Sequence, residues 1–399
     1  MAFTSLFILF LLALCGLSGR GILSQEEDLE LDRQLNILNK PPIKTFQNGV
    51  GDLIDCIDIH KQPAFDHPLL KNHRLQMRPY SIPKGLNSET VSMSDVKHTR
   101  TMSYAVDCPK GSVPIRRTRK EDLIRAKSFS ESFATTIRPF TGLTPGKHVA
   151  IVRSIPNPKI TYKGIETHVN VYNPVVQANQ SSTAQIWIQN GARDIVNSLQ
   201  AGWMVAPGLF GDNSSRIFIY WTANGSQGCF NLLCPGFIQT DHSYSLGEAM
   251  PSSKYGATVQ LEVAFRIYQD QNTGNWWLHV PFRNESVGYW PKELLPLLAG
   301  GASQVTWGGA VMGHPNVPSP QMGSGHYPNK RDIRRGSYFR QMFVIGSDNR
   351  LVEPAGPHYQ FETFVDRPQC YGLVNYGYQK KYRLGFSFLY GGPGGSCGI

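Results

Sequence analysis

Apolar and polar positions alternate along much of the second half of the chain. Clear runs occur at residues 148–153, 167–172, 184–189, 216–221, 258–267 and 276–280, with later ones at 304–311, 338–345, 360–365 and 382–390. Alternation with a period of two puts successive side chains on opposite faces, so each run predicts a β-strand with one buried face. The sequence Asn272-Thr273-Gly274 stands between two of these runs and predicts a hairpin turn.

Many short strands separated by turns are typical of antiparallel sandwiches. We therefore expect a mostly β fold, in which residues 146–399 form an antiparallel β-sandwich domain. The composition agrees with this fold class: 39 glycines, 27 prolines and 17% charged residues suit a loop-rich β-protein better than a helical one. A chain of 399 residues is long enough for such a domain and a smaller second unit.

The first part of the chain shows a different pattern. Residues 25–40 carry leucine and isoleucine partly at helical spacing, with acids first and bases last, and Pro41-Pro42 follows. This pattern predicts a helix that ends at the prolines. Residues 291–298 predict a second, short helix with proline in its first turn. Residues 116–146 are basic and rich in serine and threonine, which is typical of an exposed linker.

The chain begins with a short apolar run at residues 1–15, followed by small residues up to Ser24. Its length and position predict a secretory signal peptide at residues 1–24, with a membrane anchor as the alternative. No other long apolar run follows. We therefore expect a secreted, extracellular protein without membrane attachment, in which residues 25–145 form a smaller N-terminal unit and linker.

Cysteines and glycosylation sequons agree with export. Removal of residues 1–24 takes away Cys15 and leaves six cysteines: Cys56, Cys108, Cys229, Cys234, Cys370 and Cys397. An even number in an exported chain favours three disulfides, and chain order suggests pairing between neighbours, which is one of fifteen possible schemes. A zinc site is the alternative, but the chain has no Cys-x2-Cys spacing, so we expect no metal and no cofactor. The sequons lie at Asn179, Asn213, Asn224 and Asn284.

The formal net charge of +10 raises the question of an anionic partner. The bases are scattered, apart from clusters at residues 116–120 and 330–335, and neither cluster is interleaved with aromatic residues. A nucleic-acid platform needs such aromatics for stacking, so these clusters indicate solvated surface charge and no nucleic-acid partner. We expect a monomer.

The usual catalytic motifs are absent from the sequence. It has no Gly-x-Ser-x-Gly elbow and no His-Glu-x-x-His. Asp66 and His67 suggest an acid–base or metal pair, but the prolines around them favour a packed turn. Among the glutamates, Glu262 lies within an alternating run and shares a face with Gln260 and Ala264. Glu262 has a functional role if that face forms the floor of a cleft, and otherwise it is a solvated strand position.

Several longer motifs resemble those of the neprosin family of secreted proteins. They include residues 55–70, which look like the activation-peptide motif, and Ala201-Gly202-Trp203, Tyr220-Trp221-Thr222, Cys229-x4-Cys234 and Trp307-Gly308-Gly309. The resemblance implies a two-part secreted precursor whose C-terminal part is an antiparallel β-sandwich with a cleft. Active members of the family are glutamic endopeptidases that cleave at proline.

The resemblance also implies two catalytic glutamates, one before Ala-Gly-Trp and one after Trp-Gly-Gly. This chain has Gln200 and Ala310 at those positions. An amide does not titrate near neutral pH and alanine has no functional group, so we expect no catalytic residue at either position. Hydrolysis by carboxylates elsewhere, with Glu262 or Glu248 as candidates, is the alternative.

The sequence therefore predicts an impaired member that retains a peptide- or glycan-binding cleft. The aromatic residues Trp187, Trp203, Tyr220, Trp221, Trp276, Trp277 and Trp307 are candidates to line it, although aromatic side chains are buried by default. The expected cleft residues are Gln200, Trp203, Tyr220 and Trp307. We also expect residues 25 to about 145 to pack over the face that bears Gln200 and Ala310.

Overall fold

The computed structural model describes residues 24–85, 99–101, 107–136, 145–192, 195–223, 228–280, 285–355, 359–380 and 383–398. Residues 1–23 of the expected signal peptide and the sequons at Asn224 and Asn284 lie outside these ranges. Asn179 and Asn213 are both described, and both are exposed.

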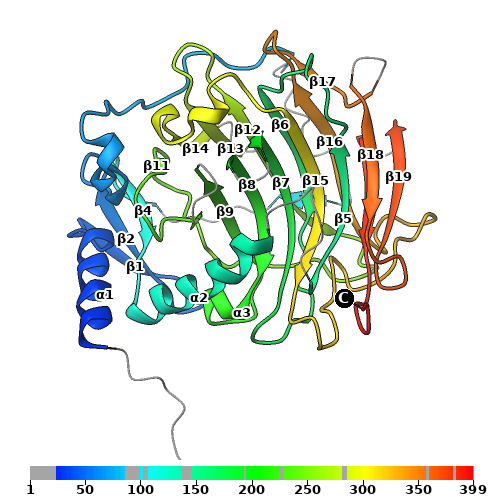
Figure 1. Ribbon diagram of the computed structural model, residues 1–399, viewed down its shortest axis with the longest axis horizontal. Helices are drawn as coiled ribbons and strands as arrows, with labels where there is room; N and C mark the ends of the chain where they lie inside the picture. Colours follow the sequence, from blue (N-terminus) through cyan, green and yellow to red (C-terminus); the bar gives the residue numbers. More distant parts are fainter. Residues whose placement is uncertain are drawn as a thin grey trace, which may run out of the picture.

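Two stacked β-sheets form the body of the molecule (Figure 1). The seven-stranded sheet has the order β10 (Cys229–Phe230), β9 (Arg216–Thr222), β8 (Ile195–Val205), β7 (Ser181–Ala192), β15 (Gln304–Met312), β5 (Lys147–Ser154) and β18 (Phe361–Val365). The ten-stranded sheet has the order β11 (Ile238–Gln239), β14 (Glu285–Trp290), β13 (Trp276–Val280), β12 (Gln260–Gln269), β6 (Gly164–Asn170), β16 (Ser337–Ile345), β20 (Gly385–Gly391) and β19 (Gly372–Gln379). In addition, β17 (Leu351–Val352) pairs with β16, and β3 (Thr99–Thr101) pairs in parallel with β12. The mostly β, antiparallel fold is therefore confirmed.

The core lies between the two sheets. Trp203 and Trp307 project from the seven-stranded sheet and are fully buried. The Trp203 indole donates a hydrogen bond to the Asn170 carbonyl at 3.0 Å, and the Trp307 indole donates to the Glu166 carbonyl at 3.3 Å. Buried indole N–H groups need such partners, and here they are supplied by β6 of the opposite sheet.

The N-terminal unit lies beside the sandwich (Figure 1). Its elements are α1 (Gln25–Leu38), a three-stranded sheet of β1 (Lys44–Gln47), β2 (Leu53–Asp58) and β4 (Ser112–Arg116), two 3-10 turns (Pro63–Asp66 and Pro68–Leu70), and α2 (Lys120–Thr136). The predicted first helix is confirmed, and Ser24 caps it by accepting a hydrogen bond from the Glu27 N–H. The short helix α3 (Pro207–Phe210) follows β8 and packs near α2.

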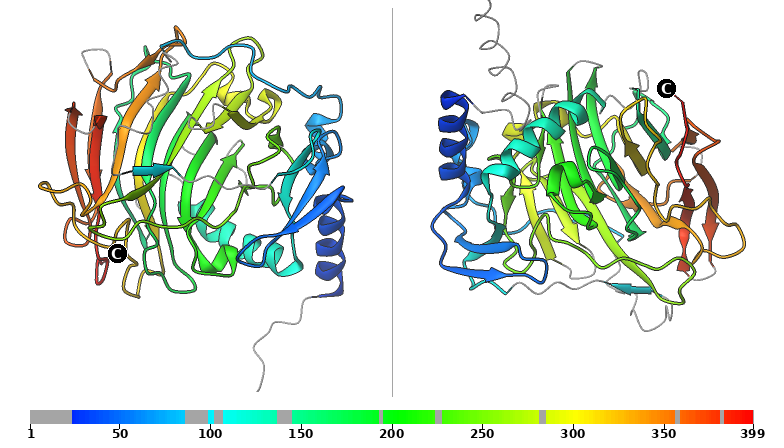
Figure 2. Two further views of the ribbon diagram at one scale, coloured as in Figure 1. Left: turned by 180° about the vertical axis from the view of Figure 1, so that it is seen from behind. Right: turned by 90° about the horizontal axis from the view of Figure 1, so that it is seen from below.

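Buried polar contacts join the N-terminal unit to the sandwich. Gln62 and Gln239 exchange two hydrogen bonds, at 2.8 and 3.0 Å. The Arg216 guanidinium of β9 lies 2.8 Å from the Asp52 carboxylate, and both side chains are buried. Asp270 accepts a hydrogen bond from the Gln76 amide at 2.7 Å. Because these partners lie far apart in sequence, the contacts fix the unit against the sandwich edge (Figure 2).

The prediction of a linker at residues 116–146 is wrong over most of its length, because residues 120–136 form α2. Leu123, Ala126, Phe129 and Phe133 follow one another at spacings of three, three and four. That spacing makes one helical face, and the basic and hydroxyl residues between these positions obscured it.

Two further differences concern other elements of the sandwich domain. The helix expected at residues 291–298 consists of two 3-10 turns, Lys292–Leu294 and Pro296–Leu298. Strands β8, β14 and β19 were not predicted. In β8 both faces are covered, so buried apolar and polar residues occur without strict alternation.

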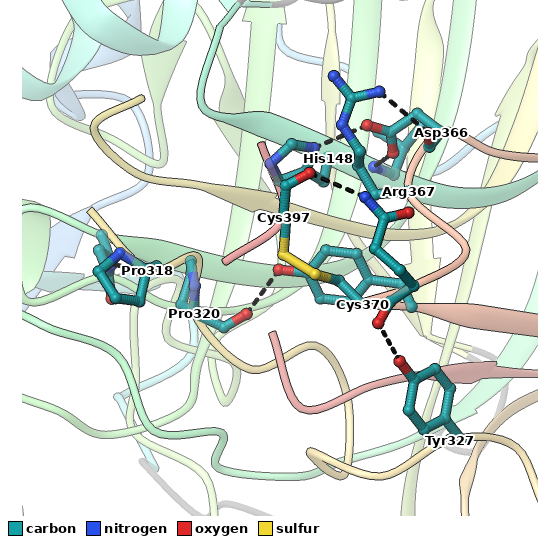
Figure 3. The surroundings of a disulfide bond; sticks show 12 residues. His148, Pro318, Pro320, Tyr327, Asp366, Arg367, Cys370 and Cys397 are labelled. Atoms are coloured by element: carbon teal, nitrogen blue, oxygen red, sulfur yellow. Dashed lines mark hydrogen bonds and ion pairs between the residues drawn. A yellow bond between two sulfur atoms is a disulfide. The ribbon is translucent and has the colours of Figure 1, made fainter. Parts of the chain in front are cut away.

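Three disulfides are present, Cys56–Cys108, Cys229–Cys234 and Cys370–Cys397, which is the pairing expected from chain order. Figure 3 shows the third bond next to the paired side chains of His148 and Asp366. The Asp366 carboxylate accepts hydrogen bonds from His148 Nδ1 and from the Val149 N–H, both at 2.7 Å. These bonds fix the start of β5 against the end of β18.

Candidate functional site

The two positions at which glutamates were expected lie on the outer face of the seven-stranded sheet. In the strand register Gln200 of β8 lies opposite Trp187 of β7, and Ala310 of β15 lies opposite Thr183 on the other side of β7. Gln200 and Ala310 therefore flank the same central strand. They line one pocket, which we call the cleft, together with Phe133, Lys147, Ser181, Thr183, Gln185, Trp187, Val311 and Met312.

A pair of glutamine side chains forms the centre of the cleft. Gln185 Nε2 donates a hydrogen bond to Gln200 Oε1 at 2.9 Å, and both side chains are almost completely buried. Among the described residues, Gln200 Nε2 and Gln185 Oε1 have no hydrogen-bond partner. If nitrogen and oxygen are exchanged in both amides, the hydrogen bond between them is preserved, and one donor and one acceptor again remain without a partner. The pair thus presents one unused donor and one unused acceptor in either assignment.

Two glycines allow this arrangement. Gln185 lies opposite Gly202 of β8 and Gly308 of β15. A Cβ at Gly202 would lie 2.7 Å from the Gln185 Cα, and one at Gly308 would lie 2.4 Å from the Ala150 carbonyl oxygen. Gly308 also has a φ of +152°, which favours glycine. Gly202 therefore allows the close approach of β8 to β7 at Gln185, and Gly308 allows the close approach of β15 to β5.

Helix α2 lies against the outer face of the seven-stranded sheet (Figures 1 and 2), and its Phe133 lines the cleft. The Phe133 ring lies 5.1 Å from the Tyr220 ring and 5.0 Å from the Phe230 ring, while Phe129 packs on Phe230 at 5.4 Å. Phe133 also lines the cleft, and the space that remains beneath it is about 10 Å³, room for roughly one water molecule. The prediction that residues 25 to about 145 pack over Gln200 and Ala310 holds for α2, whereas α1 and the three-stranded sheet lie beside the sandwich.

Among the described residues, Lys147 is the only charged one that lines the cleft. It lies opposite Met312, two positions from the Val149–Ala310 pair, so its side chain is a diagonal neighbour of Ala310 on the same face. Burial lowers the pKa of Lys147 to about 8, against the opposing effect of the Asp366 charge. Lys147 is therefore still mostly protonated at pH 7.

Trp203 and Trp307 do not line the cleft, so their assignment to it was wrong. Each stands three positions from a cleft residue, Gln200 and Ala310 respectively, and an odd separation along a strand puts two side chains on opposite faces. Both indoles lie in the core between the sheets. Tyr220 does lie on the cleft face beneath Phe133, while Trp187 is the tryptophan that lines the pocket.

Of the two alternatives for Glu262, the solvated strand position is excluded by its burial. Glu262 lies on β12 of the ten-stranded sheet and is 1% exposed. Its carboxylate accepts a hydrogen bond from the Tyr338 hydroxyl at 2.6 Å and two from the Arg340 guanidinium, at 2.8 and 2.6 Å. A buried carboxylate needs such a partner, and this pairing identifies a structural role. Neither Glu262 nor Glu248 lines the cleft, and within the described ranges no lining residue carries a carboxyl group.

Within the part of the chain that the structure describes, no group of three or more His, Cys, Asp or Glu side chains is arranged to hold a metal ion. The helices of the same part are all too short or too polar to cross a membrane.

Comparison with known families identifies the family of the chain. Residues 178–393 match the family described as neprosin, and residues 45–142 match the neprosin activation peptide. The chain belongs to the neprosin family. The first match covers more than half of the chain and includes Gln200 and Ala310. The activation-peptide match includes α2, so the helix over the cleft belongs to the neprosin activation-peptide region.

Solved structures of other proteins show a distant likeness in fold. A Scytalido-glutamic peptidase bound to a peptide-based transition-state analogue is 11% identical, with a TM-score of 0.32, over 62% of this chain and 98% of that chain. SCP-B, a member of the Eqolisin family of peptidases in complex with the tripeptide Ala-Ile-His, is 11% identical over 62% of this chain and 97% of that chain, with a TM-score of 0.30. A glycosidic hydrolase is 13% identical over 44% of this chain and 80% of that chain, with a TM-score of 0.18.

Proposed function

We propose that this neprosin-family protein is secreted, lacks the family's peptidase mechanism, and binds peptide segments in the cleft. The observation that carries the proposal is the composition of the cleft, in which Gln200 and Ala310 replace both expected glutamates and no other lining residue in the described part of the chain has a carboxyl group. Attack of water on an amide needs a base to activate the water and an acid to protonate the leaving nitrogen. The cleft residues supply neither carboxyl group.

The glutamine pair supports a peptide as the ligand. Its unused donor and acceptor complement the C=O and N–H of one peptide group. Satisfying these buried groups in a complex removes the penalty that they carry in the empty cleft. Trp187 adds an apolar wall beside the pair, as is typical of ligand sites. A glycan has similar donors and acceptors and is the alternative ligand to be tested.

Binding requires displacement of α2, because Phe133 fills the cleft. We propose the organisation expected from the sequence: a signal peptide at 1–24, a pro-segment and linker at 25–145, and the sandwich domain at 146–399. Three disulfides and the exposed sequon residues Asn179 and Asn213 support passage through the secretory pathway.

Proline-directed peptidase assays test the loss of mechanism. We expect negligible cleavage of a proline-containing peptide by the secreted protein at acidic or neutral pH, also when Phe133→Ala loosens the cover. In that background Gln200→Glu combined with Ala310→Glu should gain cleavage at acidic pH. Either single change should gain little, because the acid and the base act as a unit.

Two results would contradict this proposal. One is robust cleavage by the unmodified protein, which would point to carboxylates elsewhere. The other is failure of the opened cleft to bind any peptide while it binds a glycan or nothing. Circular dichroism of every variant separates a change at the cleft from a change in folding.

A further inference from the structure

A basic surface lies on two loops that lead into the ten-stranded sheet. Residues 324–336, which precede β16, contain four basic side chains and one acidic one: Lys330, Arg331, Arg334, Arg335 and Asp332. The loop that precedes β12 packs against them. The Gly256 N–H donates a hydrogen bond to the Arg334 carbonyl at 2.9 Å, and a Cβ at Gly256 would lie 3.9 Å from the Arg335 Cγ and Nε. The fold therefore brings Lys254 and Tyr255 next to the basic loop.

Two aromatic rings stack beside these bases. The rings of Tyr255 and His326 have their centroids 3.8 Å apart, with an angle of 18° between their planes. His326 Nδ1 donates a hydrogen bond to the Ser324 carbonyl at 2.9 Å, which fixes the orientation of the imidazole ring. Both residues are exposed, Tyr255 to 41%. The bases at 330–335 have no aromatic residue among them in the sequence, but the fold supplies a stacked pair of rings from a second loop.

Most of the positive charge around the stack is not neutralised. The Asp332 carboxylate accepts two hydrogen bonds from the Arg334 guanidinium, at 2.8 and 2.9 Å. Among the described residues, Lys254, Lys330 and Arg331 have no carboxylate partner, and all three are exposed. We call the exposed set the basic patch; it consists of Lys254, Tyr255, His326, Lys330, Arg331 and Arg335.

We propose that the basic patch binds an anionic polysaccharide, with one sugar ring packed on the Tyr255–His326 stack and its anionic groups paired with the surrounding cations. The C–H face of a sugar packs on aromatic rings, and carboxylate or sulfate groups pair with ammonium and guanidinium donors. A neutral glycan would leave the cations unused, and an acidic peptide chain would leave the stack unused. Three disulfides favour an extracellular polyanion over a nucleic acid. No residue of the patch lines the cleft, so the inference does not depend on peptide binding there.

Matched polymers test this binding. The full secreted chain is titrated with polygalacturonate, which carries carboxylates, and with dextran sulfate, which carries sulfates. Fully methyl-esterified polygalacturonate and plain dextran are their neutral counterparts. Affinity is measured by isothermal titration calorimetry at low and at physiological ionic strength. We expect a charged polymer to bind about tenfold or more tightly than its neutral counterpart, and to bind less tightly as salt screens the charges. The polymer that binds identifies the anionic group.

Substitutions locate the effect at the basic patch. Lys330→Gln combined with Arg331→Gln removes two exposed cations and should weaken binding about tenfold. Lys71→Gln combined with Arg74→Gln is the matched control, since it makes the same change in net charge at two exposed bases of the N-terminal unit and should leave binding unchanged. Tyr255→Leu keeps the charge but removes the stack. It should weaken binding of the polysaccharide and not that of polyglutamate, which is anionic but has no sugar rings.

Each outcome decides for or against the inference, once circular dichroism has shown that the variants are folded. A salt-sensitive preference for a charged polysaccharide, lost in the patch variant and reduced in Tyr255→Leu, would support it. Equal binding of charged and neutral polymers, or equal losses in the patch and control variants, would overturn it. Binding of polyglutamate or single-stranded DNA as tight as that of the polysaccharides, without any effect of Tyr255→Leu, would show a non-selective polyanion surface and would also overturn it.

Discussion

Shortening Phe133 tests whether one side chain holds the cover over the cleft. Phe133 is 8% exposed and packs edge-on against Tyr220 and Phe230. In Phe133→Ala we expect α2 to open far more often, while the sandwich stays folded. Its own core lies on the other side of the seven-stranded sheet and does not include Phe133.

The expected loss of stability follows from the burial of the Phe133 side chain. A buried aromatic side chain removes about 150–250 Å² from water, which at about 25 cal/mol per Å² gives an upper limit of about 4–6 kcal/mol. Measured Phe→Ala changes in protein cores cost about 3–5 kcal/mol. Helix α2 is able to shift toward the space, so the lower end of about 3 kcal/mol applies. This corresponds to roughly a 150-fold rise in the population of the open form.

Native-state hydrogen exchange is the assay, because it reports local opening. Amides of α2 should exchange about two orders of magnitude faster in Phe133→Ala. Amides of β7 and β8 lose only their direct contact with the helix, so their exchange rates should change far less. Ile124→Ala is the matched control, since Ile124 lies on the same helix but is 39% exposed. Unchanged exchange of α2 in Phe133→Ala, or equal acceleration in both variants, would refute the role assigned to Phe133.

Three further predictions concern buried charges. Arg216→Met should lower the free energy of unfolding by about 1–3 kcal/mol, because it removes the buried guanidinium that lies 2.8 Å from the Asp52 carboxylate and leaves Asp52 with Arg116 at 2.9 Å; an unchanged urea midpoint would contradict this. Burial raises the pKa of Asp52, but hydrogen bonds from Arg216 and the charge of Arg116 outweigh it and hold the pKa below its ordinary value of 3.8. The Asp52 contribution to stability should therefore be complete above pH 3.8 and fall as the pH drops below it, and Asp52→Asn should have a flatter stability profile in this acidic range. Glu262→Gln should lower the melting temperature, because it leaves the buried Arg340 cation without a counter-charge, while peptide binding by the Phe133→Ala background stays unchanged.

The strands that the sequence predicted best are rich in β-branched and aromatic residues, which favour strands even where every residue is buried. Residues 216–221 and 276–280 fall within β9 and β13, and the hairpin at Asn272-Thr273-Gly274 joins β12 to β13. Strand β8 escaped prediction because a helix covers its outer face, so that face does not show the alternation that exposure to water would produce. Helix α2 was not predicted because its apolar face is narrow and its other residues have a composition typical of a linker.

The candidate site was only partly predictable. Resemblance identified Gln200 and Ala310, which are 110 positions apart in the chain. Gln185 and Lys147 carried no motif, and only the register of β5, β15, β7 and β8 brings them into the same pocket. Side chains three positions apart in a strand lie on opposite faces, so Trp203 cannot share the face of Gln200. This argument was open to the sequence only once β8 was known to be a strand.

The sequence by itself determined the class of fold, the number of cysteines available for disulfides and the absence of both expected carboxyl groups, because these depend on local pattern and residue identity. The tertiary structure alone decided which side chains share the cleft, that Glu262 is buried with Arg340, and that Phe133 lies over Gln200. The reason is physical: the pairing of distant strands and the docking of a helix depend on contacts between residues far apart in the chain. Local periodicity shows which face of an element is buried but not what covers it.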